Sequence, residues 1–211
     1  MAKFILGGRM GDLIHMMYVV AHTPGGPHDL YITDRRDLHS DGFIYDLDRT
    51  IEELRPVLMY QDYVKSVQAY NNESDCVNLN LWREKAYSDN WTVLLSKMFN
   101  VPMVGDAWMK WRGRDAWYNV THCSLHPARS GDWGKVPRHS IGWNIHIGNN
   151  FVSLSELFTI IARSIHFYGE QSLPLAIAHA LDVPRIGVLN HVDAKAYIGE
   201  ELIFKKFSYV L

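Results

Sequence analysis

Lys3-Phe-Ile-Leu-Gly-Gly-Arg-Met-Gly-Asp-Leu-Ile-His15 is the stretch that decides the fold. A short apolar run stops at two glycines and continues as an apolar-rich helix, which is the pattern of a buried strand that turns into a helix. Such a turn exposes the amides at the start of the helix, where they attract anions. This end of the chain therefore predicts a ligand-binding unit of strand, turn and helix.

A matching stretch lies near the other end of the chain, and it reads Ile165-His-Phe-Tyr-Gly-Glu-Gln-Ser-Leu-Pro-Leu-Ala-Ile-Ala-His-Ala-Leu-Asp-Val-Pro-Arg-Ile-Gly-Val-Leu189. Its pattern predicts a strand, a polar turn, a helix and a second strand. Two such units at opposite ends of the chain predict two nucleotide-binding halves that face a cleft.

Strand-like and helix-like runs also alternate between these two stretches, which is the pattern of open parallel sheets. We expect strands over residues 4–6, 30–33, 64–69, 76–81, 117–124 and 141–147. We expect helices over residues 12–21, 46–58, 91–99, 154–163 and 173–181. Ser153 and Ser155 both fit the cap of the helix over 154–163. The predicted fold class is α/β, with two small Rossmann-like domains over residues 1–105 and 106–211.

Composition narrows the class of protein. The chain has 211 residues, a formal charge of −2 and 47% hydrophobic residues, which is enough apolar material for a packed core. The near-neutral charge argues against affinity that comes from bulk attraction to phosphate backbones. Two cysteines, Cys76 and Cys123, are too few for a disulfide framework or a zinc site, so we predict reduced, buried thiols. The absence of a signal-peptide pattern or a long apolar run predicts a cytoplasmic protein without membrane insertion.

The first stretch resembles a known family. Gly11-Asp-Leu-Ile-His15 is similar to the Gly-Asp-(Val/Ile)-(Ile/Leu)-His pattern of the ADP-heptose:lipopolysaccharide heptosyltransferases. Residues 153–164 and 168–189 resemble the donor domain of that family, including Ala180-Leu-Asp-Val-Pro184 before a strand. The resemblance covers these stretches and is topological elsewhere. It implies the GT-B architecture, in which two Rossmann-like domains hold a nucleotide-sugar between them, chiefly on the second domain.

The resemblance places Asp12 at the family's general base, which deprotonates the acceptor hydroxyl. A carboxylate at a loop-helix junction suits this role because a sugar hydroxyl is a poor nucleophile until its proton is accepted. Capping the helix is the alternative role of Asp12. The neighbouring substrate-binding candidates are Gly8, Arg9, Gly11 and His15. A nicotinamide-binding fold remains an alternative for this loop, with Asp34 as its acidic residue.

In the second stretch, the resemblance implies that the donor phosphates lie at a turn formed by Gly169, Glu170, Gln171 and Ser172. Amides at the start of the following helix stabilise a departing diphosphate without a metal. The chain departs from the family at two positions, since Gln171 replaces an acidic residue and Ala176 replaces a histidine. A donor other than the heptose donor is therefore expected.

A polar loop over residues 125–137 supplies cations between the halves. His126, Arg129 and Lys135 fall where the resembling family has a segment that contacts phosphate. A cation there would offset the charge that develops on the leaving diphosphate, and ordinary surface cations are the alternative. The aromatic-rich stretch over residues 108–117 is predicted to be interdomain core, with stacking on a base or sugar as the alternative. No histidine or cysteine grouping has metal spacing.

Together these features predict a compact, metal-independent glycosyltransferase that needs no cofactor and takes a nucleotide-sugar donor. The candidate acceptors are a glycan, a lipid-linked sugar or a hydroxymethylated DNA base, and the neutral charge weakens the case for DNA. Enzymes of the resembling family are longer than this chain, and such trimming is typical of phage or viral versions. The alternative from another class is a non-catalytic, Rossmann-type nucleotide-binding module in which Asp12 is only a helix cap.

Overall fold

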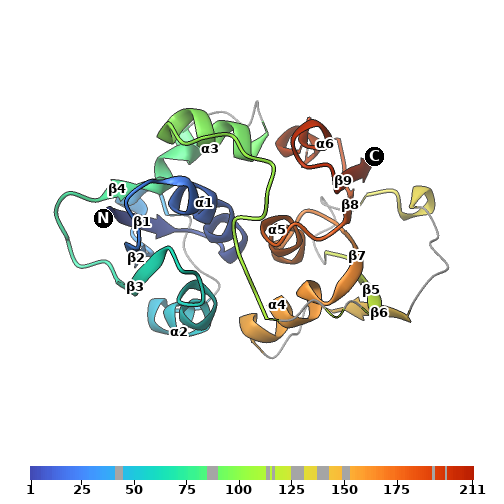
Figure 1. Ribbon diagram of the computed structural model, residues 1–211, viewed down its shortest axis with the longest axis horizontal. Coiled ribbons are helices and arrows are strands. Elements are labelled where there is room, and N and C mark those ends of the chain that lie inside the picture. The colour runs from blue at the N-terminus through green and yellow to red at the C-terminus, as the bar shows by residue number, and fades with distance from the viewer. Residues whose placement is uncertain are drawn as a thin grey trace.

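The fold contains two parallel sheets with helices packed around them (Figure 1). It is seen in a computed structural model that describes residues 1–40, 45–84, 90–112, 115, 117–124, 131–136, 143–148, 153–191, 193–197 and 199–211. None of the helices in these ranges is long and apolar enough to cross a membrane.

The first sheet has four strands in the order β3-β2-β1-β4. They are β1 (Lys3–Gly7), β2 (His28–Thr33), β3 (Val64–Ala69) and β4 (Val77–Asn78). All neighbours are parallel, so each connection must cross over, and helices supply the crossovers. The helical elements are α1 (Met10–His22), η1 (Arg36–Leu38), α2 (Leu47–Leu58), η2 (Leu79–Glu84) and α3 (Trp91–Phe99), where η denotes a 3-10 helix.

The second sheet has five parallel strands in the order β6-β5-β7-β8-β9. They are β5 (Tyr118–His122), β6 (Trp143–Ile147), β7 (Ser164–Gly169), β8 (Arg185–Val188) and β9 (Phe207–Val210). The helical elements are η4 (Trp133–Lys135), α4 (Leu154–Ala162), α5 (Leu173–Ala180), η5 (Asp193–Ala196) and α6 (Glu200–Ile203).

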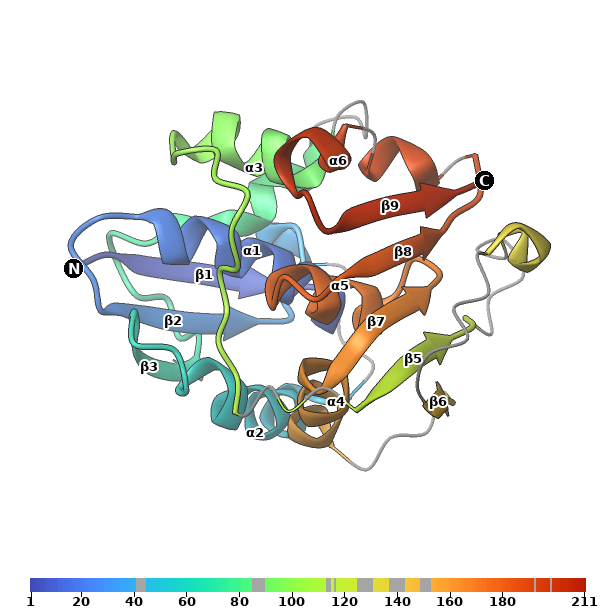
Figure 2. The same ribbon diagram turned by 45° about the vertical axis from the view of Figure 1, so that its right-hand side comes forward.

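The two halves share a buried core, because α1 of the first packs against α5 of the second and α2 packs against α4. Figure 2 shows the segment after α3 running between α1 and α5. Trp108 in this segment is 3% exposed; its Nε1 donates to the Ile14 carbonyl, and its amide donates to the Ala180 carbonyl. The prediction of interdomain core is therefore confirmed for Trp108, whereas Trp117 is 68% exposed.

Most predicted elements are confirmed to within a few residues. Ser153 is the cap of α4, since its Oγ accepts from the Glu156 amide at 3.1 Å. Two expectations need correction, and one α-helix and one strand are additional to the prediction. The run over 76–81 contains only the two-residue strand β4 before η2 begins, and α6 and β9 were not predicted. Cys123 is exposed and Cys76 is partly exposed, because both lie at strand ends instead of in the core.

Candidate functional site

Each sheet has one position where the strand order reverses, and these positions define the candidate site. In the first sheet β2 and β4 flank β1, and in the second sheet β6 and β7 flank β5. In open parallel sheets, ligands bind beyond the carboxyl ends of the strands at such switch points. The relevant loops therefore follow β1 and β4 in the first half and β5 and β7 in the second.

The loop after β1 is shaped by two glycines. Gly8 has a φ of +94°, a left-handed conformation that a residue with a side chain adopts only with strain. A Cβ at Gly8 would lie 2.1 Å from a terminal nitrogen of Arg83, and a Cβ at Gly7 would lie 2.5 Å from the Thr33 carbonyl oxygen. The Gly8 amide donates to Ser40 Oγ at 2.9 Å. Neighbouring atoms therefore pack directly against the backbone of this loop, and position 8 requires glycine.

Asp12 lies in the first turn of α1 and is paired with an arginine of η2, the 3-10 helix that follows β4. Its Oδ2 accepts from an Arg83 terminal nitrogen at 2.5 Å and from the Arg9 amide at 3.2 Å. The Asp12 side chain is 17% exposed and the Arg83 side chain 8% exposed. A negative charge in the first turn also interacts favourably with the helix dipole. Asp12 therefore both caps α1 and forms a mostly buried ion pair.

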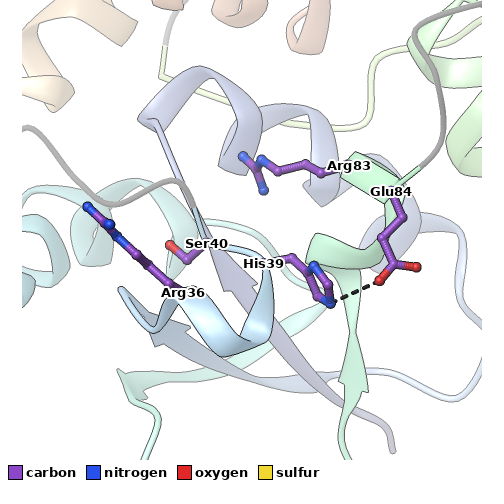
Figure 3. Close-up of a pocket in the computed structure, with 5 residues that line it drawn as sticks. All are labelled: Arg36, His39, Ser40, Arg83 and Glu84. Carbon is purple, nitrogen blue, oxygen red and sulfur yellow. Dashed lines mark ion pairs between the residues drawn. The ribbon is translucent and has the colours of Figure 1, made fainter.

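A pocket of about 420 Å³ lies beside this ion pair, and its lining residues are Arg36, His39, Ser40, Arg83 and Glu84. Figure 3 shows these side chains arranged around the space between η1 and η2. His39 Nε2 and Glu84 Oε1 are 3.0 Å apart on one side of it. Charged side chains thus line a pocket that is in direct contact with the partner of Asp12.

The turn after β7 is organised by a buried carboxylate. Glu170 is 1% exposed, and it accepts from the Ser124 amide at 2.7 Å and from Trp133 Nε1 at 2.8 Å. These donors come from the chain after β5 and from η4, so Glu170 joins the loops at the second switch point. Ser172 follows as the N-cap residue of α5, and its Oγ donates to the Glu170 carbonyl at 3.1 Å.

The helices that begin at the two loops are in contact. A Cβ at Gly11 would lie 3.6 Å from Leu173 Cα, 3.8 Å from Leu173 N and 3.9 Å from Ala176 Cβ. The N-terminal turns of α1 and α5 are therefore neighbours, although their residues are far apart in the sequence. Because each helix N-terminus carries about half a positive charge, two adjacent ones form a region that attracts anions.

Comparison with known proteins gives the fold a name. The structure of E. coli heptosyltransferase WaaC with ADP superposes on the chain with a TM-score of 0.53 and 11% sequence identity, covering 99% of this chain and 92% of that one. The chain has the GT-B fold of that glycosyltransferase. No protein-family profile matches the sequence, and no curated protein matches it significantly.

In this GT-B fold, the predicted site residues fall into separate places. Gly8, Gly11 and Asp12 lie in the loop and first turn of α1, with Arg9 exposed between them. Gly169 ends β7, and Glu170, Gln171 and Ser172 form the turn that leads into α5. The two groups are linked through α5, since Leu173 and Ala176 are the residues that lie next to Gly11.

The remaining predicted residues lie apart from these groups. His15 is 2% exposed and packs edge-on against Trp91, with ring centroids 4.5 Å apart. The Lys135 ammonium donates to the Leu211 backbone oxygen at 2.7 Å and lies 3.6 Å from Asp132 Oδ2. His126 and Arg129 lie outside the described residues.

His15 belongs instead to a buried polar cluster between the halves. Its ring centroid lies 5.6 Å from that of His179 in α5, and His179 Nε2 lies 3.5 Å from Glu200 Oε2. Burial, with help from the Arg185 charge, lowers the pKa of His15 to about 3 and the pKa of His179 well below its usual value. Burial raises the pKa of Glu200 well above its usual value, against the opposing effect of Arg185.

Arg83 and Ser40 are site residues that the sequence did not indicate. Arg83 is 71 positions from Asp12 and lies two residues beyond the run over 76–81 that the sequence predicts to be a strand. Ser40 follows a 3-10 helix of three residues. No local spacing rule connects either residue with the loop after β1, because the contact depends on the order of the strands.

Proposed function

We propose that this protein is a metal-independent glycosyltransferase that moves a sugar from a nucleotide-sugar to an acceptor hydroxyl. One observation carries the proposal: the first turn of α1, which holds Asp12, and the first turn of α5 come from opposite halves of a GT-B fold and meet at Gly11 and Leu173. A transfer reaction needs a proton acceptor and a phosphate-binding element next to each other. The Asp12 carboxylate suits the first role, and the amides at the start of α5 suit the second.

The roles follow from the chemistry of each group. The diphosphate of the donor binds the amides at the start of α5, where Ser172 and Leu173 carry N–H groups and Pro174 carries none. The acceptor hydroxyl attacks the anomeric carbon, forming a new carbon–oxygen bond while the bond to the diphosphate oxygen breaks. The hydroxyl proton passes to the Asp12 carboxylate, and the nucleoside diphosphate leaves with the bonding electron pair. The helix dipoles stabilise the charge that develops on it.

The donor is proposed to differ from that of the resembling family. ADP is bound to the E. coli heptosyltransferase whose structure superposes on this chain. Here Gln171 and Ala176 stand where the family has an acidic residue and a histidine. Replacing a carboxylate with an amide adds donors and removes a charge, so a different sugar or base would fit this turn.

The test is transfer or hydrolysis measured over a panel of UDP-, GDP-, ADP- and CMP-sugars, with glycan, lipid-linked and hydroxymethylated-DNA acceptors. We expect one donor to turn over, and Asp12→Asn to lower kcat by at least ~10²-fold, the scale of a lost general base. The Asn variant should keep the fold and the affinity for the nucleotide. Full activity of Asp12→Asn would remove Asp12 from the mechanism, and an inactive panel would remove the proposed function.

A specific observation favours the second candidate, a non-catalytic nucleotide-binding module. Asp12 Oδ2 accepts from both Arg83 and the Arg9 amide, which is the arrangement expected of a structural cap and ion pair. In that case a nucleotide would stabilise the protein without any sugar release, and Asp12→Asn would lower stability without a separate kinetic effect.

A further inference from the structure

Arg83 connects three parts of the first half at the base of the β1–α1 loop. One terminal nitrogen donates to the Gly7 carbonyl at 3.4 Å and to Asn80 Oδ1 at 3.4 Å. The other donates to Asp12 Oδ2 at 2.5 Å. The guanidinium also fills the space in which a side chain at Gly8 would lie. The position of the Asp12 carboxylate therefore depends on a residue of η2, the 3-10 helix that follows β4.

The physical effect of such a pair depends on its burial. The Arg83 side chain is 8% exposed and that of Asp12 is 17% exposed, so solvent and salt screen the two charges less than they screen a surface pair. A cation next to a carboxylate favours its ionised form. A guanidinium holds a carboxylate oxygen in a defined direction, which an ammonium does less well.

We propose that Arg83 is the positioning residue of the transfer site, holding Asp12 ionised and in one orientation at the start of α1. The proposal rests on the proposed function, in which Asp12 takes the proton from the hydroxyl group of the acceptor substrate. A base must be deprotonated and within hydrogen-bond reach of that proton; Arg83 supplies both conditions without touching the reacting atoms. Gly8 is then a glycine because the guanidinium occupies the space that its side chain would need.

Other charged groups stand in the elements next to this pair, and Arg36, His39 and Glu84 line the pocket beside Arg83. Arg9 is in the same loop, Arg36 and His39 come from η1 and the residue after it, and Glu84 ends η2. Glu170 stands in the turn before α5, where its oxygens accept from Ser124 and Trp133. The Arg83 guanidinium donates directly to the Asp12 carboxylate.

The matched variants are Arg83→Gln, which removes the charge, Arg83→Lys, which keeps it, and Arg36→Gln, which removes the same charge from the same pocket. The primary readout is the pH titration of the Asp12 side-chain carboxyl, followed by carbon-13 NMR in the full chain. This readout requires no activity. The second readout is the acidic limb of the kcat profile, with the donor that the panel identifies.

We expect Arg83→Gln to raise the titration midpoint of Asp12 by about one pH unit or more, the scale of a lost arginine neighbour. The acidic limb of the kcat profile of Arg83→Gln should also move to higher pH. Its kcat should be lower, and its affinity for the nucleoside diphosphate should be unchanged. Arg83→Lys should keep a midpoint near that of the wild type and lower kcat, because the charge remains and the orientation is lost. Arg36→Gln should leave the midpoint within about 0.3 pH unit, since a charge exposed to solvent is screened.

An Asp12 midpoint unmoved in Arg83→Gln would overturn the proposal, as would an equal shift in Arg36→Gln. If Arg83→Gln does not fold by circular dichroism, Arg83→Lys carries the test: a wild-type midpoint with lowered kcat supports the role, and a wild-type kcat overturns it. An inactive donor panel would instead overturn the proposed function, and the NMR titration would still report whether Arg83 controls Asp12.

Discussion

Gly11 of α1 and Leu173 of α5 meet across the two halves, so that a methyl group at Gly11 would lie 3.6 Å from Leu173 Cα. This distance is ordinary van der Waals contact, and a longer side chain would start from a Cβ already in contact with Leu173 and Ala176 of α5. The start of the helix that carries Asp12 is thereby held against the start of the helix that follows the Gly169–Ser172 turn. The closeness of the two N-terminal turns depends on a small residue at this point.

Substitutions at Gly11 should therefore have graded effects. Gly11→Ala should preserve nucleotide binding, because the added methyl group finds contacts of 3.6 Å or more. Gly11→Leu should separate α1 from α5 and weaken transfer more than ~10²-fold, since small displacements of reacting groups can cost that much. Kinetics and calorimetry on both variants would measure this. Equal activity of the two would show that the helix contact does not set the distance between the sites.

A substitution at Gly8 should displace Arg83 as well as strain the backbone. In Gly8→Ala the new Cβ would lie 2.1 Å from an Arg83 terminal nitrogen, in a residue whose φ is +94°. Gly199→Ala is the matched control, because its φ is +82° and an added Cβ would meet nothing within 4 Å. Both variants should lose about 1 kcal/mol or more of stability from the left-handed backbone. Only Gly8→Ala should also shift the Asp12 titration, so a shift in Gly199→Ala would contradict the assignment.

The sequence predicted most elements because their patterns are local. α2 begins after Asp46, whose side chain accepts from the Arg49 amide, and α3 begins after Asn90, which accepts from the Thr92 and Val93 amides. Such caps are readable from residue type and spacing. The strand predicted over 76–81 is longer than the observed β4, which ends at Asn78. The chain leaves the sheet there, where Asn78 Oδ1 accepts from the Asn80 amide. A side chain that bonds its own backbone offers an alternative to the strand ladder.

The site was predictable only where its residues stand at the ends of strands. Asp12 and Glu170 stand in the segments that follow β1 and β7, whereas Arg83 reaches Asp12 from 71 positions along the chain. Glu170 was expected to face a substrate, and its carboxylate bonds to Ser124 and Trp133. His15 was expected to bind substrate beside Asp12, but its side chain is buried against the rings of Trp91 and His179.

The buried cluster between the halves should make stability depend on pH. An unfolded histidine binds its proton near pH 6.5, whereas His15 does so only near pH 3. Between these values the unfolded state binds more protons, so the stability present above pH 6.5 is lost as the pH falls, by up to ~1.4 kcal/mol per pH unit. His179 acts in the same direction. Glu200 acts oppositely, since its raised pKa gives stability that is lost as the pH rises.

Urea unfolding at a series of pH values would measure this dependence. His15→Phe should flatten the acidic side of the curve, because the aromatic contact with Trp91 can remain while the titrating group is removed. His191→Phe makes the same change at an exposed position and should leave the slope unaltered. Identical slopes in the wild type and His15→Phe would mean that His15 does not contribute to acid sensitivity.

Chelation should leave the transfer rate unchanged. The proposed site stabilises the leaving diphosphate with helix N-termini, and no group of three His, Cys, Asp or Glu residues among the described positions could hold a metal ion. Rates measured before and after EDTA treatment, with and without added Mg²⁺, would check this. A strict requirement for Mg²⁺ or Mn²⁺ would contradict the metal-independent mechanism.

The last prediction concerns which half binds the nucleotide. Ser172 caps α5 without a side-chain bond to its amides, so Ser172→Ala should leave the backbone donors in place and keep nucleotide binding. Ser172→Trp should fill the space in front of those amides. It should abolish the stabilisation by the cognate nucleoside diphosphate, which amounts to ~2.7 kcal/mol with ligand at 100 times its dissociation constant.

Measuring the stabilisation by the nucleoside diphosphate in Gly8→Ala tests the other half of the protein in the same way. Gly8→Ala alters the first half and should impair the use of acceptor while the thermal shift with the nucleotide is retained. This pattern would place the donor on α5 and the acceptor on the β1–α1 loop, as in the proposed mechanism. Loss of nucleotide binding in Gly8→Ala, together with its retention in Ser172→Trp, would reverse the assignment, because the phosphate would then lie at the start of α1 as in an ordinary dinucleotide-binding fold.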